Sequence, residues 1–325
     1  MKTTSAAGTG QATPIPPWPG ELVTVGADEL FVRRVPAAPG AEPALCVHGL
    51  GGASTNWTDL MDVLRTPAGG VAGGGVAGGL ACEAVDLPGF GRSPQSHSGS
   101  YSISAQAAVV GRLIEQSGRG PVHLIGNSMG GAIITRLAAR RPELVRTLTL
   151  ISPALPDLRP RPVPARVTVV TVPALGPWLL RRAGKTPAEK RVALLLRDVY
   201  YDPSVVHPSR VAEEIAELQR IEGLGYLGDA LLKSAQALVA EYLRRGPGSL
   251  WRDAASIDAS VLVIYGSHDR LVNSKMAVRA ARSFRDARVV LLPRTGHVAM
   301  LERPGQVARE MWAMMSDAAA RGPQA

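Results

Sequence analysis

The 325-residue chain has little cysteine and no long uninterrupted hydrophobic run. Its two cysteines, Cys46 and Cys82, lie in short apolar stretches, so we expect small buried side chains and exclude the disulfide framework of a secreted domain. The longest apolar stretch, Val167–Leu180, is interrupted by threonine, proline and glycine and is shorter than the ~20 residues of a membrane-spanning helix. The first twenty residues lack the apolar segment of a signal peptide, so we expect a cytoplasmic protein.

Lysine is also scarce, and nearly all of the 36 basic residues are arginine. The net charge is +9, but the excess is spread along the chain and forms no basic stripe, so we expect no nucleic-acid partner. Hydrophobic residues make up 46% and charged residues 19%, a balance that favours a large core and excludes general disorder. The segment 69–79 is almost pure glycine, alanine and valine, and we interpret it as a floppy insertion.

Strand-like and helix-like segments alternate through the first half of the chain. After a predicted hairpin at 22–35, apolar strands are expected at 44–47, 82–85, 122–125 and 145–151, with helices at 57–64, 104–116 and 129–140. The strands are apolar on both sides, which is typical of a parallel sheet covered by helices on both faces.

The alternation stops after residue 153 and resumes only near residue 251. Helical patterns fill the interval at 187–199, 209–221 and 229–244, and strands then follow at 261–265 and 289–292, with helices at 276–284 and 306–317. We therefore divide the chain into a flexible tail (1–20), the first part of an α/β core (21–153), a helical cap (154–250) and the second part of the core (251–325).

Gly126-Asn127-Ser128-Met129-Gly130 fits the pattern G-x-S-x-G between an apolar strand and a helix. This context is typical of a nucleophile elbow, where a serine at a sharp turn presents its hydroxyl at the carboxyl edge of the sheet. Small neighbours must leave room for the turn, and the adjacent glycines fulfil that requirement.

A serine needs a base, and the base needs an orienting acid. Asp269 follows the strand that ends near Tyr265, and His297 follows the strand that ends near Leu292, so both lie on the same rim as Ser128. We assign Ser128 as nucleophile, His297 as general base and then acid, and Asp269 as the carboxylate that fixes the imidazole tautomer. The backbone N–H groups of Leu50 and Met129 are the predicted oxyanion hole.

The motifs in this order resemble the α/β-hydrolase superfamily, in its lidded serine-hydrolase branch. The matching segments are 48–51, 86–93, the elbow with its doubled Gly130-Gly131, 266–269 and 295–297. The resemblance implies a mostly parallel eight-stranded sheet with helices on both faces and an inserted helical cap. It also leaves Asp157 as an alternative acid and assigns His48 a structural role in the oxyanion loop. Such motifs specify the fold and the triad, but not the substrate.

Other polar residues compete for roles in the predicted site. His123 lies inside a strand and is interpreted as a packed core residue, and His268 should point away because it adjoins Asp269. His97 and His207 lack the motif that surrounds His297. Asp86 precedes a Leu-Pro-Gly turn, which indicates that it shapes a loop.

The apolar stretch 167–180 of the cap, including Trp178, favours a hydrophobic substrate that excludes water from the oxyanion. Gly49, Trp178 and Met300 are the predicted substrate-binding residues. The same apolar side chains could instead pack the cap onto the core, or touch a lipid surface beside Arg181-Arg182. We do not expect membrane contact, and the sequence does not indicate an oligomeric state.

The predicted function is hydrolysis of carboxylic esters of small to medium apolar acids through an acyl-enzyme. The partner is a small-molecule ester, no cofactor is needed, and no cluster has the spacing of a metal site. A carbon–carbon hydrolase of ring-cleavage dienoates is a second possibility, although Gly52 and Val298 depart from the residues usual in that group. A cofactor-free perhydrolase would carry the same triad, and a protein that binds a ligand on this fold without turnover is the hypothesis outside enzymes.

Overall fold

A computed structural model describes residues 14–66, 78–157, 169, 171–172 and 175–321. Its centre is one eight-stranded sheet in the order β1-β2-β4-β3-β5-β6-β7-β8. β1 and β2 form an antiparallel hairpin, β2 is antiparallel to β4, and all other neighbours are parallel. The strands are β1 Gly20–Val25, β2 Asp28–Arg34, β3 Glu42–Val47, β4 Leu80–Val85, β5 Val122–Asn127, β6 Val145–Ile151, β7 Ser260–Gly266 and β8 Ala287–Leu292. The predicted mostly parallel sheet is confirmed.

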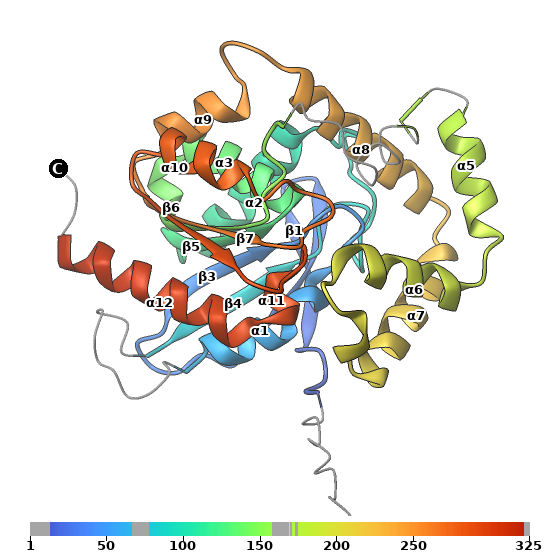
Figure 1. Ribbon diagram of the computed structural model, residues 1–325, viewed down its shortest axis with the longest axis horizontal. Coiled ribbons are helices and arrows are strands. Elements are labelled where there is room, and N and C mark those ends of the chain that lie inside the picture. The colour runs from blue at the N-terminus through green and yellow to red at the C-terminus, as the bar shows by residue number, and fades with distance from the viewer. Residues whose placement is uncertain (1–13, 67–77, 158–168, 170, 173–174, 322–325) are drawn as a thin grey trace, which may run out of the picture.

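Helices cover the sheet on two faces (Figure 1). One layer contains α2 Ile103–Ser117, α3 Met129–Arg140, α9 Leu250–Ser256 and α10 Met276–Ser283, and the other contains α1 Thr58–Leu64, α11 Ala299–Glu302 and α12 Pro304–Arg321. Each face has its own hydrophobic cluster, one around Leu124, Leu148 and Val263, the other around Ile125, Ile151 and Ile264. Successive residues of a strand point to opposite faces, so strands that are buried throughout supply both clusters.

In the described part of the chain, four further helices lie between β6 and α9. They are α5 Leu175–Gly184, α6 Ala188–Val199, α7 Pro208–Glu222 and α8 Leu227–Leu243, and short 3-10 turns occur at Ser54–Trp57, Pro142–Leu144 and Pro203–Val205. Figure 1 shows α5, α6 and α7 together at one side of the molecule, with α8 leading back to the core. No helix in the described part of the chain combines the length and apolar content needed to cross a bilayer.

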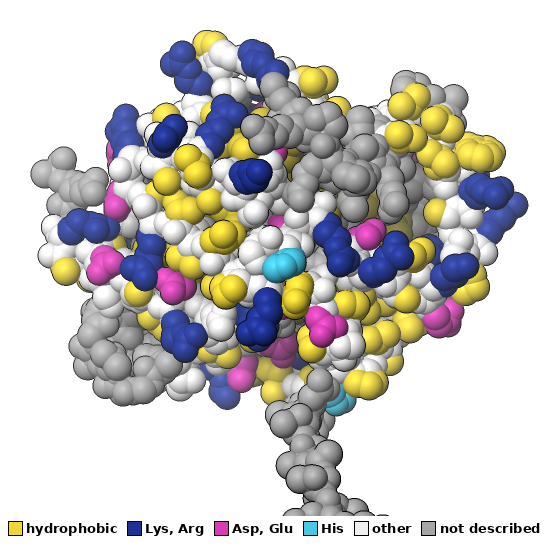
Figure 2. Space-filling model, viewed as in Figure 1, with side chains coloured by type: hydrophobic (Ala, Val, Ile, Leu, Met, Phe, Trp, Pro, Cys, Tyr) yellow, Lys and Arg dark blue, Asp and Glu magenta, His cyan; other side chains and the backbone are white. Residues whose placement is uncertain are grey.

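Several predicted segments lie partly outside the described residues, namely the tail, the glycine-rich segment 69–79 and the apolar stretch 167–180. The division into core and cap remains our interpretation of the element order. On the face shown in Figure 2, the described Lys and Arg side chains are scattered among acidic, polar and apolar ones. Cys46 and Cys82 are free and buried, and burial raises the pKa of both thiols, that of Cys82 to about 12.

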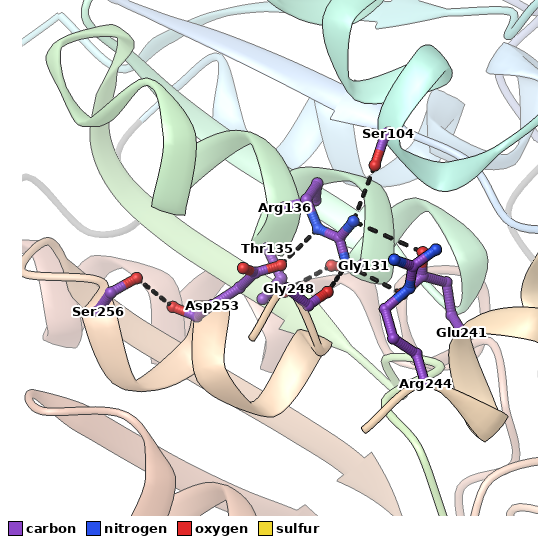
Figure 3. A network of polar contacts seen from close by, with 9 residues as sticks. All are labelled: Ser104, Gly131, Thr135, Arg136, Glu241, Arg244, Gly248, Asp253 and Ser256. Atoms are coloured by element: carbon purple, nitrogen blue, oxygen red, sulfur yellow. Dashed lines mark hydrogen bonds and ion pairs between the residues drawn. The ribbon is translucent and has the colours of Figure 1, made fainter. Parts of the chain in front are cut away.

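A buried arginine joins the end of α8 to the core (Figure 3). Arg136 on α3 is 1% exposed and pairs with Glu241 of α8 at 2.9 Å and with Asp253 of α9. It also donates to Ser104 Oγ on α2 and to the Gly248 carbonyl, each at 2.8 Å. A buried charge is tolerated only when its partners replace the lost water, and here they come from four separate segments.

Replacing this arginine tests how firmly the helices are joined. Arg136→Ala removes the buried cation that pairs with Glu241 and Asp253 and should lower the free energy of unfolding by about 3 to 5 kcal/mol, measured by urea denaturation. Arg285 provides the control, because its pair with Asp258 is more than 60% exposed on both sides. Arg285→Ala should cost less than about 1 kcal/mol. Equal losses in the two variants would contradict the anchoring role of Arg136.

Candidate active site

Ser128 lies at the turn between β5 and α3, with φ 52° and ψ −117°. A non-glycine residue in this region is strained, and such strain persists where the surrounding structure enforces it. The neighbouring glycines allow the turn: a Cβ on Gly130 would lie 2.1 Å from the Val47 carbonyl oxygen, and one on Gly126 would lie 2.8 Å from the Gly130 carbonyl. Ser128 therefore sits on a nucleophile elbow whose packing excludes larger neighbours.

His297 and Asp269 form a buried pair at the carboxyl ends of β8 and β7. His297 Nδ1 lies 2.9 Å from Asp269 Oδ2, and each residue is 4% exposed. The other carboxylate oxygen accepts the N–H groups of Leu271 at 2.8 Å and Val272 at 2.9 Å. Since Nδ1 donates to the carboxylate, Nε2 is the basic nitrogen of the neutral imidazole.

Burial is the largest influence on the pKa of Asp269 and raises it. The charge and hydrogen bond of His297, the Val272 N–H and the Ser152 side chain together outweigh burial, so the pKa lies below its ordinary value. The carboxylate is therefore ionised at neutral pH and able to stabilise an imidazolium.

The side chain of Asn127 connects the elbow to the histidine loop. Its Nδ2 group donates to the Ile151 carbonyl at 3.0 Å and to the His297 carbonyl at 3.1 Å, although residues 127 and 297 are 170 positions apart. Ser128 and His297 also line the same cavity. The structure thus gathers the three predicted side chains at one edge of the sheet.

The loop after β3 lies against Ser128, because a Cβ on Gly49 would be 3.0 Å from Ser128 Cβ. His48 holds this loop: its Nε2 accepts the Leu87 N–H at 3.0 Å, and Nδ1 donates to the Gly49 carbonyl at 2.7 Å. Burial lowers the pKa of His48, which favours the neutral ring that these two hydrogen bonds require. Within the described chain, the N–H groups of Leu50 and Met129 have no hydrogen-bond acceptor, as an oxyanion hole requires.

The competing histidines have other partners. His123 is 2% exposed and contacts Thr147 Oγ1 and Glu42, and the His268 ring lies 4.6 Å from that of Tyr201. His207 accepts the Ser209 N–H at the start of α7, and His97 is exposed.

The two competing aspartates also have distinct places. Asp86 accepts the Ser54 and Arg92 N–H groups and so shapes two loops. Asp157 lines the cavity, while Asp269 is the acid that contacts His297.

The predicted substrate-binding residues occupy different places. Gly49 lines the cavity beside Ser128. Trp178 is 50% exposed on α5, and its ring lies under the Arg182 guanidinium. Met300 is 1% exposed and packs in the hydrophobic cluster beneath the sheet, so it is not part of the cavity wall. Met300 is close to His297 in the sequence, which led to the expectation that it lines the cavity. Helix α11 instead directs its side chain into the hydrophobic cluster.

A cavity of about 1880 Å³ lies between the rim of the sheet and the inserted helices. One end is apolar and is formed by α8 and the loop after β7, with Leu238, Val239, Tyr242, Leu271 and Val272 in its wall. Burial, and then Asp157 and Asp269, raise the pKa of Tyr242, so this apolar end lies near the Asp269 carboxylate.

The other end of the cavity is charged. The α7 helix contributes two arginines and three glutamates to its wall, and the core contributes Arg33, Asp59 and Arg92. Arg210 pairs with Asp59 at 2.6 Å, which holds α7 against α1. The cavity wall therefore combines an apolar part on α8 with a part on α7 that is rich in hydrogen-bonding groups.

Residues 43–304 match the family described as alpha/beta hydrolase fold. The chain belongs to this family. Among curated relatives, this hydrolase is 26% identical over 300 residues to monoacylglycerol lipase abhd6-B of Xenopus laevis, covering 88% of this chain and 79% of that protein. It is 27% identical over 274 residues to a 2-hydroxy-6-oxononadienedioate/2-hydroxy-6-oxononatrienedioate hydrolase of Burkholderia vietnamiensis, covering 84% and 87%.

Matches also extend to larger proteins. The hydrolase is 32% and 26% identical to dihydrolipoyllysine-residue acetyltransferase components of acetoin cleaving systems from Cupriavidus necator and Pseudomonas putida. These matches cover 39% and 85% of this chain but span only 30% and 64% of those relatives' lengths.

Solved structures share the fold. A putative lipase from Acinetobacter baumannii has a TM-score of 0.73 at 19% identity, covering 94% of this chain and 93% of that chain. The 2-hydroxy-6-oxo-6-phenylhexa-2,4-dienoate hydrolase of Rhodococcus has a TM-score of 0.69 at 20% identity, covering 91% and 99%.

Sequence reasoning missed Asn127, whose side chain links the elbow to the histidine loop, and Ser152, whose side chain lowers the pKa of Asp269. Asn127 is 4% exposed and Ser152 is 0% exposed with φ 44°. Asn127 is the last residue of β5 and Ser152 directly follows β6, so a polar residue at the carboxyl end of an apolar strand was the available signal.

The low pKa of Asp269 predicts a pH-dependent contribution to stability. A carboxyl whose pKa is lower in the folded than in the unfolded protein stabilises the fold above its ordinary pKa, and this contribution is lost as pH falls through the folded value. Asp269→Asn should therefore lower the free energy of unfolding at pH 7 by about 1 to 3 kcal/mol. The difference from wild type should shrink below about pH 4.

Urea denaturation at several pH values measures this difference. The control is Asp258→Asn, which alters a carboxylate whose side chain is 64% exposed. A gap between Asp269→Asn and wild type that stays constant from pH 7 to the acid range would contradict the prediction.

Proposed function

We propose that this hydrolase cleaves carboxylic esters of small to medium apolar acids through an acyl-enzyme on Ser128. The observation that carries the proposal is the buried contact between His297 Nδ1 and Asp269, tied by Asn127 to the elbow that presents Ser128. This arrangement provides a nucleophile, a base with a defined tautomer and an ionised acid beside one cavity.

In the proposed reaction, Ser128 Oγ attacks the ester carbonyl while His297 Nε2 accepts the hydroxyl proton. The carbonyl π electrons move to oxygen, and the N–H groups of Leu50 and Met129 stabilise that oxyanion, aided by the positive end of α3. The C–O bond then breaks and the alcohol leaves with the proton from His297. Water attacks the acyl-enzyme through the same base, and the acid is released with Ser128 restored.

These two parts of the cavity wall support separate places for the acyl and alcohol parts of the substrate. The apolar wall with Leu238 and Tyr242 adjoins Asp269, so we place the acyl chain there. The charged end on α7 offers donors and acceptors that suit a hydroxyl-bearing alcohol. A relative named as a monoacylglycerol lipase agrees with this polarity, since such a substrate joins an apolar acid to a polar alcohol.

One observation favours a second candidate, a carbon–carbon hydrolase of ring-cleavage dienoates. Arg33 and Arg92 line the charged part of the cavity wall. Their charges lower the pKa of Glu217, but neither is within direct salt-bridge distance of a carboxylate among the described residues. Two cations without such a partner suit a substrate carboxylate. The Burkholderia relative bears the name of such a hydrolase.

Ser128→Ala tests the nucleophile. Removing the hydroxyl should lower kcat for p-nitrophenyl butyrate by a factor on the order of 10⁶, because the acyl-enzyme no longer forms. The variant should also lose labelling by a fluorophosphonate probe while keeping the circular dichroism spectrum of the wild type. Turnover close to the wild-type rate would refute the mechanism.

Leu238→Glu tests the acyl assignment. A charge in the apolar wall should lower kcat/KM for p-nitrophenyl octanoate by more than about tenfold and change the acetate much less, because only the longer chain reaches the wall. Leu22→Glu is the control, since Leu22 is 52% exposed on β1. Equal losses of kcat/KM for both esters would reject the assignment of the acyl site. If the wild-type protein turned over a ring-cleavage dienoate faster than any ester, the second candidate function would be favoured.

A further inference from the structure

The end of helix α6 is bonded to the loops that carry the catalytic pair. The His297 N–H donates to the Val199 carbonyl at 2.7 Å, and Arg270, next to Asp269, donates to the Arg197 carbonyl. The backbones are in close contact, because a Cβ on Gly296 would lie 2.4 Å from the Val199 carbonyl oxygen. The inserted helices therefore touch the catalytic base through its own peptide group.

Glu302 on α11 completes this junction. Its Oε1 accepts the Gly296 N–H at 2.7 Å, and its Oε2 accepts the Tyr201 N–H at 2.9 Å. One carboxylate thus joins the peptide before His297 to the residues that follow α6. The side chain is partly buried and lines the cavity.

The glycine before His297 explains why the histidine loop needs hydrogen bonds that hold its backbone in place. Residue 296 is glycine, whose backbone has more conformational freedom than any other residue. The contacts on either side of it fix the imidazole: Val199 holds the His297 N–H, Asn127 holds the His297 carbonyl, and Glu302 holds the Gly296 N–H. A carboxylate suits the position of Glu302, because an ionised carboxylate accepts hydrogen bonds at both oxygens and donates none.

We propose that Glu302 is a positioning residue for catalysis. Its carboxylate fixes the position of the Gly296–His297 peptide relative to the Val199–Tyr201 segment, so that the imidazole faces Ser128. This inference rests on the proposed function, since it concerns the base of that reaction. A displacement of about 1 Å in such a group is enough to lower a rate by about 100-fold.

The experiment compares Glu302→Gln, Glu302→Asp and the control Glu310→Gln in the full chain. Gln keeps the shape but presents an NH₂ group to one of the two N–H donors, whereas Asp keeps both acceptors on a shorter side chain. Glu310 on α12 pairs with Arg288 at the surface, so its variant makes the same charge change elsewhere. The readouts are kcat and KM for p-nitrophenyl butyrate, the rate of fluorophosphonate labelling, and Tm.

For Glu302→Gln we expect kcat and the labelling rate to fall together by about 10- to 100-fold, with KM within about twofold of wild type. Glu302→Asp should recover part of the lost kcat, and Glu310→Gln should match wild type. A purely structural role would instead lower Tm and the active fraction without a slower rate per labelled site.

Two results would overturn the inference: a Glu302→Gln kcat within twofold of wild type, or a loss in Glu302→Gln that Glu302→Asp does not relieve at all. If Glu302→Gln does not fold, Glu302→Ala, which removes both acceptors, takes its place: a kcat within twofold of wild type would reject the role, and a reduced kcat at unchanged KM would support it. If the wild-type protein shows neither ester turnover nor labelling, the proposed function itself is overturned. If the wild type is active and Glu302→Gln is equally active, only the role of Glu302 is overturned.

Discussion

The hydrogen bond between Asp269 and His297 is the contact around which the active-site end of the molecule is built. Two ionisable groups that are each 4% exposed are costly to bury, and several other contacts reduce that cost. The Leu271 and Val272 N–H groups satisfy one carboxylate oxygen, and the histidine peptide is bonded on both sides. Glycine at 266 allows the histidine loop to pass directly over the end of β7, because a Cβ there would lie 2.0 Å from the Gly296 carbonyl. The same contacts therefore pack the strand ends and orient the His297 imidazole.

Two of the contacts between the inserted helices and the core differ in chemistry. At the end of α6 the Val199 carbonyl accepts the His297 N–H, and the nearby Tyr201 N–H donates to the Glu302 carboxylate. Near the end of α8 the contacts are the buried ion pairs of Arg136, on the helix that begins directly after Ser128. The first contact reaches the loop that carries His297, and the second reaches the helix that follows Ser128. The cavity is thus bounded by helices whose positions are tied to Ser128 on one side and to His297 on the other.

The fold was largely predictable because its strands are short, apolar and separated by clear helix signals. The predicted helix 129–140 matches α3, and the predicted strand 145–151 matches β6. The chain order of Ser128, Asp269 and His297 indicated which residues should meet, since parallel strands end at a common edge.

Contacts made by residues with no motif around them were not predictable. Arg136 lies mid-helix among apolar residues, and its acidic partners come from segments more than 100 positions away. Met300 and Trp178 were expected at the cavity, but the direction of a side chain depends on how its helix packs, which local pattern does not determine. The two-sided role of Glu302 depends on Tyr201, whose position follows from the packing of the inserted helices.

The pairing of β6 with β7 bears on how the helices inserted between these two strands could be exchanged for others. Ile151 and Ile264 are direct partners, although the inserted helices separate them in the chain. In topological terms the whole insertion is a loop, and its replacement by another insert would leave the strand register unchanged. Any substitute would have to replace the contacts that the insertion now makes with the core, among them the Val199 carbonyl on the His297 peptide and the Glu241 carboxylate beside the buried Arg136. Cavities of different shape are thus compatible with one edge of the sheet, provided that these contacts are preserved.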